Sequence, residues 1–241
     1  MLRDYQIEMK TRLMEAWKAH RSVMVQMPTG TGKTHLLASV VSEFVSSAGS
    51  GVWLIAHRRE LVAQMEETLA KYGIRREDTP VRVMSVQWLS RHWNEAGDAP
   101  GLIVIDEAHH ALAASYTEMW KRYPAAKKLG VTATPCRLNR RGFTELFEVL
   151  VTSWSIAEFI EKGVLSVFDY VSIRPGSEEQ RLIDGLEKRG ADGDYQVKEM
   201  DAVLNRRPGI ERLYRSVRQF ASGKKGMVYA ISIEHARRIA E

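Results

Sequence analysis

Short apolar runs alternate with amphipathic segments along the first 135 residues. Continuous apolar runs about five residues long are typical of strands buried on both faces of a sheet, and they occur at 23–27, 52–56, 81–84, 102–105 and 128–132. Helical spacing of apolar positions between these runs predicts helices at 5–20, 36–47, 60–71, 86–93 and 116–122. Strands that alternate with helices predict an α/β fold, with a central parallel sheet and helices on both of its faces.

The pattern changes after residue 140. Helices are predicted at 142–150, 155–162, 178–189, 198–221 and 234–241, with an interruption of the fourth at Pro208 and Gly209. An extended segment is predicted at 164–173, and a strand at 227–231. The sequence contains no internal repeat and no low-complexity tract.

A glycine-rich loop joins the first apolar run to the helix that follows it. The loop reads Met27, Pro28, Thr29, Gly30, Thr31, Gly32, Lys33 and Thr34, so only its first position departs from the phosphate-loop pattern. Gly30 and Gly32 allow backbone N–H groups to converge on a polyphosphate, at the positive end of the new helix. Lys33 can reach the outer phosphates, and the Thr34 hydroxyl can hold Mg²⁺. The alternative is a turn that happens to end in Lys-Thr.

Two adjacent carboxylates, Asp106 and Glu107, follow the apolar strand at 102–105. Such groups are costly after a buried strand unless they meet a cation or carry out proton chemistry. Asp106 would hold Mg²⁺, and Glu107 would orient and deprotonate the water that attacks the terminal phosphorus. The alternative is an acidic helix start capped by Asp106. A zinc site at His109 and His110 is disfavoured because no other ligands stand at useful spacing.

Polar groups also follow the other predicted strands. Because ligands of parallel α/β sheets gather at the carboxyl ends of the strands, these groups are expected to share one edge with the glycine loop. Besides the carboxylates they comprise His57, Arg58, Ser85, Thr132, Ala133 and Thr134.

Composition narrows the class of protein and of partner. The chain has 241 residues, 44% of them hydrophobic and 27% charged, and its net charge of +5 favours a polyanionic partner. Cys136 is the only cysteine, and we expect it to be a small packing residue. Without a signal-like N-terminus or an apolar run long enough to span a membrane, the cytoplasm is the expected location.

In their order along the chain, residues 28–34, 106–109 and 132–135 resemble motifs I, II and III of DEAH-type superfamily 2 helicases and translocases. The resemblance is closer to the group that contains RadD-like repair helicases, XPB helicases and type I restriction motors. Weaker matches cover the N-terminal adenine-reading motif at 2–6, motif Ia at 55–61, the next strand end at 84–87 and motif IV at 227–236.

The resemblance implies roles for individual residues. ATP and Mg²⁺ are the implied cofactors, with adenine read by Gln6 and assisted by Arg3. His109 and the segment from Thr132 to Thr134 would link nucleotide state to nucleic-acid contacts. The phosphate backbone of one strand would be bound by His57, Arg58, Ser85 and Gln87, through contacts that carry no sequence information. For His57 and Arg58 the alternative is a solvated helix start.

The resemblance also implies a RecA-like ATP-binding domain at 1–160, followed by a linker and an incomplete second RecA-like domain at 161–241. The expected function is an ATP hydrolase that acts as a DNA helicase or translocase in DNA repair. The arginine finger of the second domain has no match in these residues, so the chain is expected to be a fragment that binds ATP and hydrolyses it poorly. A steady-state ATPase assay with single-stranded DNA tests this expectation.

Three alternatives stay open at this point. They are a restriction or defence motor, a nucleotide-gated nucleic-acid-binding module and a small-molecule kinase, which the carboxylate pair and the Thr-Ala-Thr segment disfavour. The preference for DNA over RNA rests on the resemblance alone. Trp53, Trp88 and Trp93 are as compatible with a core position as with a base-stacking platform.

Overall fold

The computed structural model describes residues 2–57, 59–75, 77–110, 114–135, 143–172, 177–189 and 195–241. The chain divides into two compact units, Met1–Val167 and Phe168–Glu241. Each unit is described by itself.

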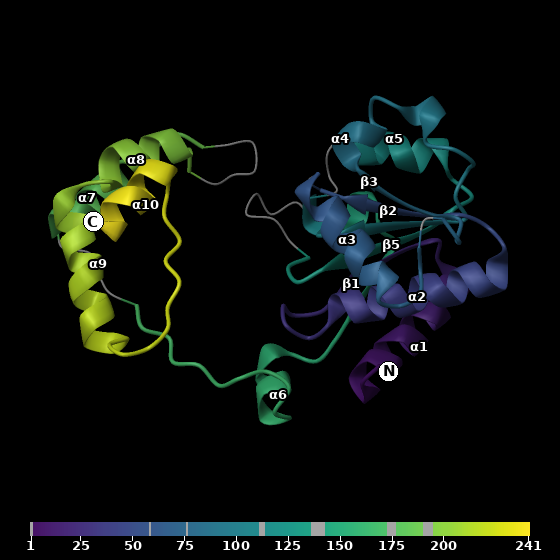
Figure 1. The fold of residues 1–241 in the computed structure, drawn as a ribbon, viewed down its shortest axis with the longest axis horizontal. Helices are drawn as coiled ribbons and strands as arrows, with labels where there is room; N and C mark the ends of the chain where they lie inside the picture. Colours follow the sequence, from purple (N-terminus) through teal and green to yellow (C-terminus); the bar gives the residue numbers. More distant parts are fainter. Residues whose placement is uncertain are drawn as a thin grey trace. The chain divides into compact units, whose positions relative to one another are not determined.

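The first unit is built on a six-stranded sheet in the order β3-β2-β4-β5-β1-β6 (Figure 1). All five strand pairings are parallel. The strands are β1 (Ser22–Gln26), β2 (Val52–Ala56), β3 (Val81–Ser85), β4 (Leu102–Asp106), β5 (Lys127–Thr132) and β6 (Val149–Thr152). The predicted parallel α/β fold is confirmed, and five of the six strands lie within a residue or so of the predicted runs.

Helices cover both faces of this sheet. Figure 1 shows α1 (Asp4–Ala19) and α2 (Lys33–Ala48) on one side of the strands, and α4 (Val86–Leu89) and α5 (Ala114–Arg122) on the other. The remaining helices of the unit are α3 (Glu60–Ala70), α6 (Ile156–Glu161) and the 3₁₀ turns η1 (Trp93–Glu95), η2 (Ala108–His110) and η3 (Phe143–Glu145).

Alternate residues of the strands feed two separate hydrophobic cores. Along β2, Leu54 belongs to the core under α1, α2 and α3, whereas Trp53 and Ile55 belong to the core under α4 and α5. All three side chains are at most 2% exposed. Strands buried on both faces read as continuous apolar runs, which is why the pattern of the sequence located them.

The predicted helix at 142–150 is wrong for the residues that the structure describes there. Only the turn η3 is helical, and β6 follows it and pairs with β1 from Val149 to Thr152. The Glu148 carboxylate accepts hydrogen bonds from the backbone N–H groups of Arg21 (2.6 Å) and Ser22 (2.9 Å), which aligns the two strands. The β-branched Val149 and Val151 also favour a strand.

Two predicted helices have different limits in the structure. The helix predicted at 86–93 is shorter, because α4 ends at Leu89 and residues 93–95 form the separate turn η1. The break predicted at Pro208 lies earlier, between α8 (Val197–Leu204) and α9 (Arg207–Phe220). Proline stands in the first turn of α9, where its missing N–H costs no hydrogen bond.

The second unit consists of helices in its described part. It contains α7 (Ser177–Asp184), α8, α9 and α10 (Ile233–Ala240). The Ser232 hydroxyl donates to Asp201 (2.5 Å) and the Arg238 guanidinium donates to the Asn205 carbonyl (2.7 Å), so side chains tie α10 to α8.

The strand predicted at 227–231 is absent from the described residues of this unit, where the isolated bridge between Arg189 and Tyr195 is the only β pairing. An apolar run becomes a strand only beside a partner strand, and none of the described residues supplies one for 227–231. Among all described residues, no helix is both long and apolar enough to cross a membrane.

Candidate nucleotide site

The glycine loop lies between the end of β1 and the first turn of α2, as predicted. Gly30 and Gly32 have φ angles of 84° and 79°, in the left-handed region that favours glycine. A Cβ atom on Gly32 would collide with the Gln6 side-chain amide. The buried Thr31 hydroxyl donates to the Pro28 carbonyl (2.7 Å) and closes the turn. The loop therefore holds the N-terminal end of a 16-residue helix toward any ligand bound there.

Side chains in the first turn of α1 hold this loop in place by hydrogen bonds. Tyr5 donates from its hydroxyl to the Thr31 carbonyl (2.9 Å), and Gln6 donates from Nε2 to the carbonyls of Thr31 (3.1 Å) and Gly32 (3.2 Å). The Gln6 Oε1 atom accepts from the Arg3 backbone N–H (2.9 Å), and Gln6 is 3% exposed. Both polar atoms of Gln6, predicted to read adenine, thus bind the protein's own backbone here. The sequence did not identify Tyr5 as a residue of the site, although Tyr5 is the direct neighbour of Gln6.

Lys33 and Thr34 begin α2. The Lys33 ammonium lies 3.4 Å from the Met27 carbonyl, so its side chain crosses the mouth of the loop. Thr34 is exposed in the first helical turn. Pro28 is buried, while Thr29 and Gly30 are exposed on the outer surface of the loop. This set of donors, one ammonium, one free hydroxyl and helix-start N–H groups, fits a polyphosphate with a divalent cation.

The carboxylate pair lies at the end of β4. Glu107 has a φ of 49° and is the only described non-glycine residue with a positive φ, a strained conformation that is common at functional sites. Burial raises the pKa of the Asp106 carboxyl, and the negative charge of Glu107 adds to the rise. The Glu107 backbone N–H, which donates to Asp106 (3.0 Å), and the nearby Lys33 charge oppose this pKa increase.

A buried carboxyl with a raised pKa beside a lysine is a group that a bound cation would stabilise in its charged form. The structure also puts Asp106 within electrostatic reach of Lys33, 73 positions away in sequence (106 − 33). Among the described residues, no cluster of three or more His, Cys, Asp and Glu side chains could form a metal site by itself. A cation at Asp106 would therefore need ligands from a bound nucleotide or from water.

His109 connects this pair to the segment after β5. The Thr132 hydroxyl donates to the Thr134 carbonyl (3.1 Å), and the His109 Nδ1 atom is hydrogen-bonded to Thr132 Oγ1 at 2.8 Å. The same Nδ1 lies 3.3 Å from a Glu107 carboxylate oxygen. A chain of contacts thus runs from Glu107 through His109 to Thr132.

The segment from Thr132 to Thr134 also contacts the start of the glycine loop. The Met27 N–H donates to the Thr132 carbonyl (3.0 Å), and the Gln26 side chain donates to the Ala133 carbonyl (3.3 Å). The Thr134 N–H returns a hydrogen bond to the Thr132 hydroxyl (3.1 Å). Gln26, at the last position of β1, is a further residue that sequence reasoning missed.

The residues predicted to contact nucleic acid lie at the neighbouring strand ends. Ala56 and Ser85 are paired in the sheet, and the Gln87 amide donates to the His57 carbonyl (2.7 Å). The Ser85 hydroxyl accepts the Trp88 N–H (3.2 Å) and caps α4, so it has a structural role as well. Arg58 lies outside the described residues.

Comparison with known proteins places this site in a family. The sequence profile described as "Type III restriction enzyme, res subunit" matches residues 1–137. The "DNA 3'-5' translocase XPB2" of Sulfurisphaera tokodaii is 28% identical over 205 residues, which cover 78% of this chain and 44% of that protein. The "51.5 kDa protein" of a Lactococcus phage is 26% identical over 220 residues, 90% of this chain and 46% of that protein.

Solved structures agree on the fold. The Hef helicase domain of Pyrococcus furiosus has a TM-score of 0.59 at 17% identity, with 91% of this chain and 55% of that chain covered. The chain spans less than half the length of the two relatives above. With its RecA-like sheet and a profile match over more than half of its residues, the chain belongs to the family described as type III restriction enzyme, res subunit, among the superfamily 2 helicases and translocases.

Proposed function

We propose that the first unit binds ATP with Mg²⁺ and supplies the phosphate-binding and water-activating groups with which the whole protein hydrolyses it. The proposal rests on one observation: the glycine loop, the carboxylate pair and the Thr132–Thr134 segment interact with one another at one end of a parallel sheet. The interactions are hydrogen bonds and the electrostatic effect of Lys33 on Asp106. Three separate strand ends supply groups with complementary charges for a metal-bound polyphosphate.

The charge of each residue in the site indicates its role in binding or hydrolysis. Lys33 and the start of α2 would bind the phosphates, and Thr34 with Asp106 would hold the Mg²⁺ that neutralises them. Glu107 would orient the attacking water and accept its proton. His109 contacts both Glu107 and Thr132, so it would couple the presence of the reacting phosphate to the conformation of the neighbouring strand ends.

For the whole protein we propose an ATP-dependent DNA helicase or translocase. The relative XPB2 is named as a DNA translocase, and the basic chain suits a polyanionic track. His57, Arg58, Ser85 and Gln87 would line that track, and residues 161–241 would form a linker and the N-terminal part of a second RecA-like domain. A role in restriction is the second candidate beside DNA repair, and the family's name favours it.

Binding of a fluorescent ATP analogue tests the site. Lys33→Ala removes the cation at the loop and should weaken affinity at least tenfold, since charge-assisted contacts to phosphate are among the strongest hydrogen bonds. The matched control is Lys71→Ala, which removes an exposed lysine just after α3. Equal affinity of Lys33→Ala and wild type would overturn the proposed site.

Glu107→Gln separates binding from hydrolysis. The variant keeps a side chain of the same size but cannot accept a proton, so nucleotide affinity should persist while DNA-stimulated turnover of the whole protein drops about 10² to 10⁴-fold. Turnover is compared with wild type in a steady-state phosphate-release assay. Unchanged turnover would assign the proton acceptor to another group.

A further inference from the structure

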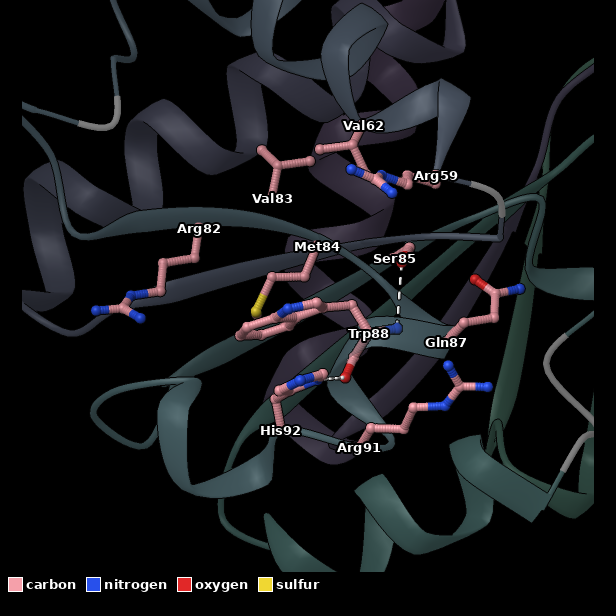
Figure 2. A pocket seen from close by; sticks show the side chains of 10 residues that line it. All are labelled: Arg59, Val62, Arg82, Val83, Met84, Ser85, Gln87, Trp88, Arg91 and His92. Carbon is pink, nitrogen blue, oxygen red and sulfur yellow. Dashed lines mark hydrogen bonds between the residues drawn. The ribbon is translucent and has the colours of Figure 1, made fainter.

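A cavity of about 940 Å³ lies beside β3, the strand at the open edge of the sheet. Figure 2 shows its lining, which comes from the start of α3, from β3 and from the segment that begins with α4. Its volume is in the range of about 300 to 1,000 Å³ that is typical of ligand pockets. The lining residues are Arg59, Val62, Arg82, Val83, Met84, Ser85, Gln87, Trp88, Arg91 and His92.

Trp88 provides a partly exposed aromatic ring in this cavity, with His92 stacked on one of its faces. It is 38% exposed, whereas Trp53 is 2% exposed and Trp93 packs against the core. The Trp88 and His92 rings are stacked, with centroids 4.8 Å apart and planes 8° from parallel. The structure therefore distinguishes the tryptophan available for stacking from those with a packing role.

A hydrogen bond fixes the orientation of the stacked pair. The His92 Nδ1 atom lies 2.8 Å from the Trp88 backbone carbonyl, which can only accept, so Nδ1 carries the proton and donates. The Trp88 N–H donates to the Ser85 hydroxyl, so both backbone polar groups of Trp88 are hydrogen-bonded to side chains. The aromatic surface is thus held in place before any ligand arrives, which lowers the entropic cost of stacking.

Positive charge surrounds the pair. Of the ten lining residues three are arginines, Arg59, Arg82 and Arg91, and none is acidic. Within the described residues, no carboxylate lies at ion-pairing distance from any of the three. Figure 2 shows the three side chains in one view with the stacked rings, and the Arg82 side chain extends away from them. A flat ring among arginines that have no carboxylate partner in the described residues fits a planar base that carries phosphates.

The cavity adjoins the residues proposed to bind the nucleic-acid backbone. Ser85 and Gln87 are part of its lining, and Gln87 is hydrogen-bonded to the His57 backbone. A strand that follows these residues along its phosphates would bring its bases within reach of the Trp88 ring.

We propose that Trp88, supported by His92, is a stacking platform for a base of single-stranded nucleic acid, with Arg59 and Arg91 contacting the flanking phosphates. The proposal rests on the nucleic-acid binding put forward above and adds to it. Backbone contacts do not depend on the base, whereas stacking requires one. The platform would therefore let the protein distinguish a strand with bases from a bare sugar-phosphate chain.

The test uses the full chain and two labelled oligonucleotides of equal length, oligo-dT and an abasic deoxyribose-phosphate chain. Fluorescence anisotropy at one fixed salt concentration gives both affinities. Wild type should bind oligo-dT about tenfold more tightly than the abasic chain. Trp88→Ala and Trp88→Leu should both lose this preference and keep the abasic affinity. Trp88→Phe should retain most of it, and the control Tyr229→Ala, which removes an exposed aromatic outside the cavity, should retain all of it.

Arg91→Ala should weaken binding of both oligonucleotides and reduce the salt dependence of binding. A loss confined to oligo-dT would contradict its assignment to phosphate.

Equal affinity of wild type for the two oligonucleotides would overturn the platform and leave the proposed nucleic-acid binding in place. A preference for oligo-dT that survives in Trp88→Leu would do the same. Failure of wild type to bind either oligonucleotide would instead overturn the proposed nucleic-acid binding, and the platform with it.

Discussion

The backbone of Glu107 is the most unusual feature at the scale of single residues. Its φ of 49° departs from the extended backbone of β4, and Glu107 lies close enough for its charge to raise the pKa of Asp106. Strain of this kind costs about 1 to 3 kcal/mol and persists only where the surroundings enforce it. Here the Asp106 carboxylate accepts the Glu107 N–H and helps to hold the turn.

The raised pKa of Asp106 makes stability depend on pH at this residue. The folded protein binds this proton more tightly than the unfolded chain does, so the stabilisation is complete below the unfolded pKa of about 3.8. It is lost as the pH rises through the folded-state pKa. Asp106→Asn carries no such proton, and its melting temperature should exceed that of wild type by a few degrees at neutral pH.

This difference is measured by thermal unfolding between pH 4.5 and 7.5 with a chelator present. It should shrink toward acidic pH, because wild-type Asp106 then becomes neutral like the asparagine. The exposed Asp98, changed to Asn, serves as the control and should show no such trend. A difference that stays constant with pH, or that grows toward acidic pH, would contradict the assignment.

At the scale of elements, hydrogen bonds from α1 hold the glycine loop of the proposed nucleotide site. Gly32 is the N-cap of α2 and also the point of closest approach to the Gln6 amide. Two separate requirements, a left-handed backbone and the absence of a Cβ atom, therefore fall on one residue.

The variants Gly32→Ala and Gly49→Ala separate these two requirements. Gly49 has a φ of 61° at the other end of α2, and nothing lies within 4 Å of a Cβ atom placed there. Gly49→Ala should lose only about 1 to 2 kcal/mol of stability from the left-handed backbone and keep its nucleotide affinity. Gly32→Ala should lose more stability and bind the ATP analogue at least tenfold more weakly, because Gln6 must move.

Chemical denaturation and titration with the fluorescent analogue measure both variants. Equal effects of the two substitutions on stability and affinity would show that the contact with Gln6 has no importance for the loop.

The sequence predicted correctly those elements whose own residues form a recognisable apolar pattern or motif. The runs that became β2 and β4 are apolar at every buried position, and the glycine loop stands between a strand and a helix, so periodicity and motif agree. For β6 the signal is not local. Val149 and Val151 form a strand because β1 lies beside them, and β1, whose Ser22 N–H donates to Glu148, is more than 120 residues away in sequence.

The same limit applies to the site. It could be predicted that the glycine loop, Asp106 and Thr132 lie at strand ends that share one edge of the sheet, because parallel topology brings strand ends together. The contacts of His109 with Thr132 and of Gln6 with the loop depend on side-chain orientation across the fold. Periodicity contains no information on such contacts. For the same reason the sequence could not show that Trp88 is exposed, because Trp53, Trp88 and Trp93 have similar sequence surroundings.

At the scale of the whole molecule, the hydrophobic core is distributed unevenly between the two units. Both core clusters consist of residues from Tyr5 to Phe159, with partly buried neighbours up to Leu165. Within the described part of the second unit, Leu186 is the only buried apolar residue. Phe168, Tyr170 and Val171, just past the boundary, are at least half exposed. Stability that depends on apolar burial should therefore come from the first unit.

A shortened chain of residues 1–167 tests this distribution directly. It keeps the whole sheet, both cores and every described residue of the proposed nucleotide site. Since little apolar surface of the second unit is buried, its melting temperature by circular dichroism should lie within a few degrees of that of the full chain. It should also bind the fluorescent ATP analogue with unchanged affinity. A shortened chain that is unfolded, or folded but unable to bind, would show that residues 168–241 stabilise the site in a way that the burial pattern does not reveal.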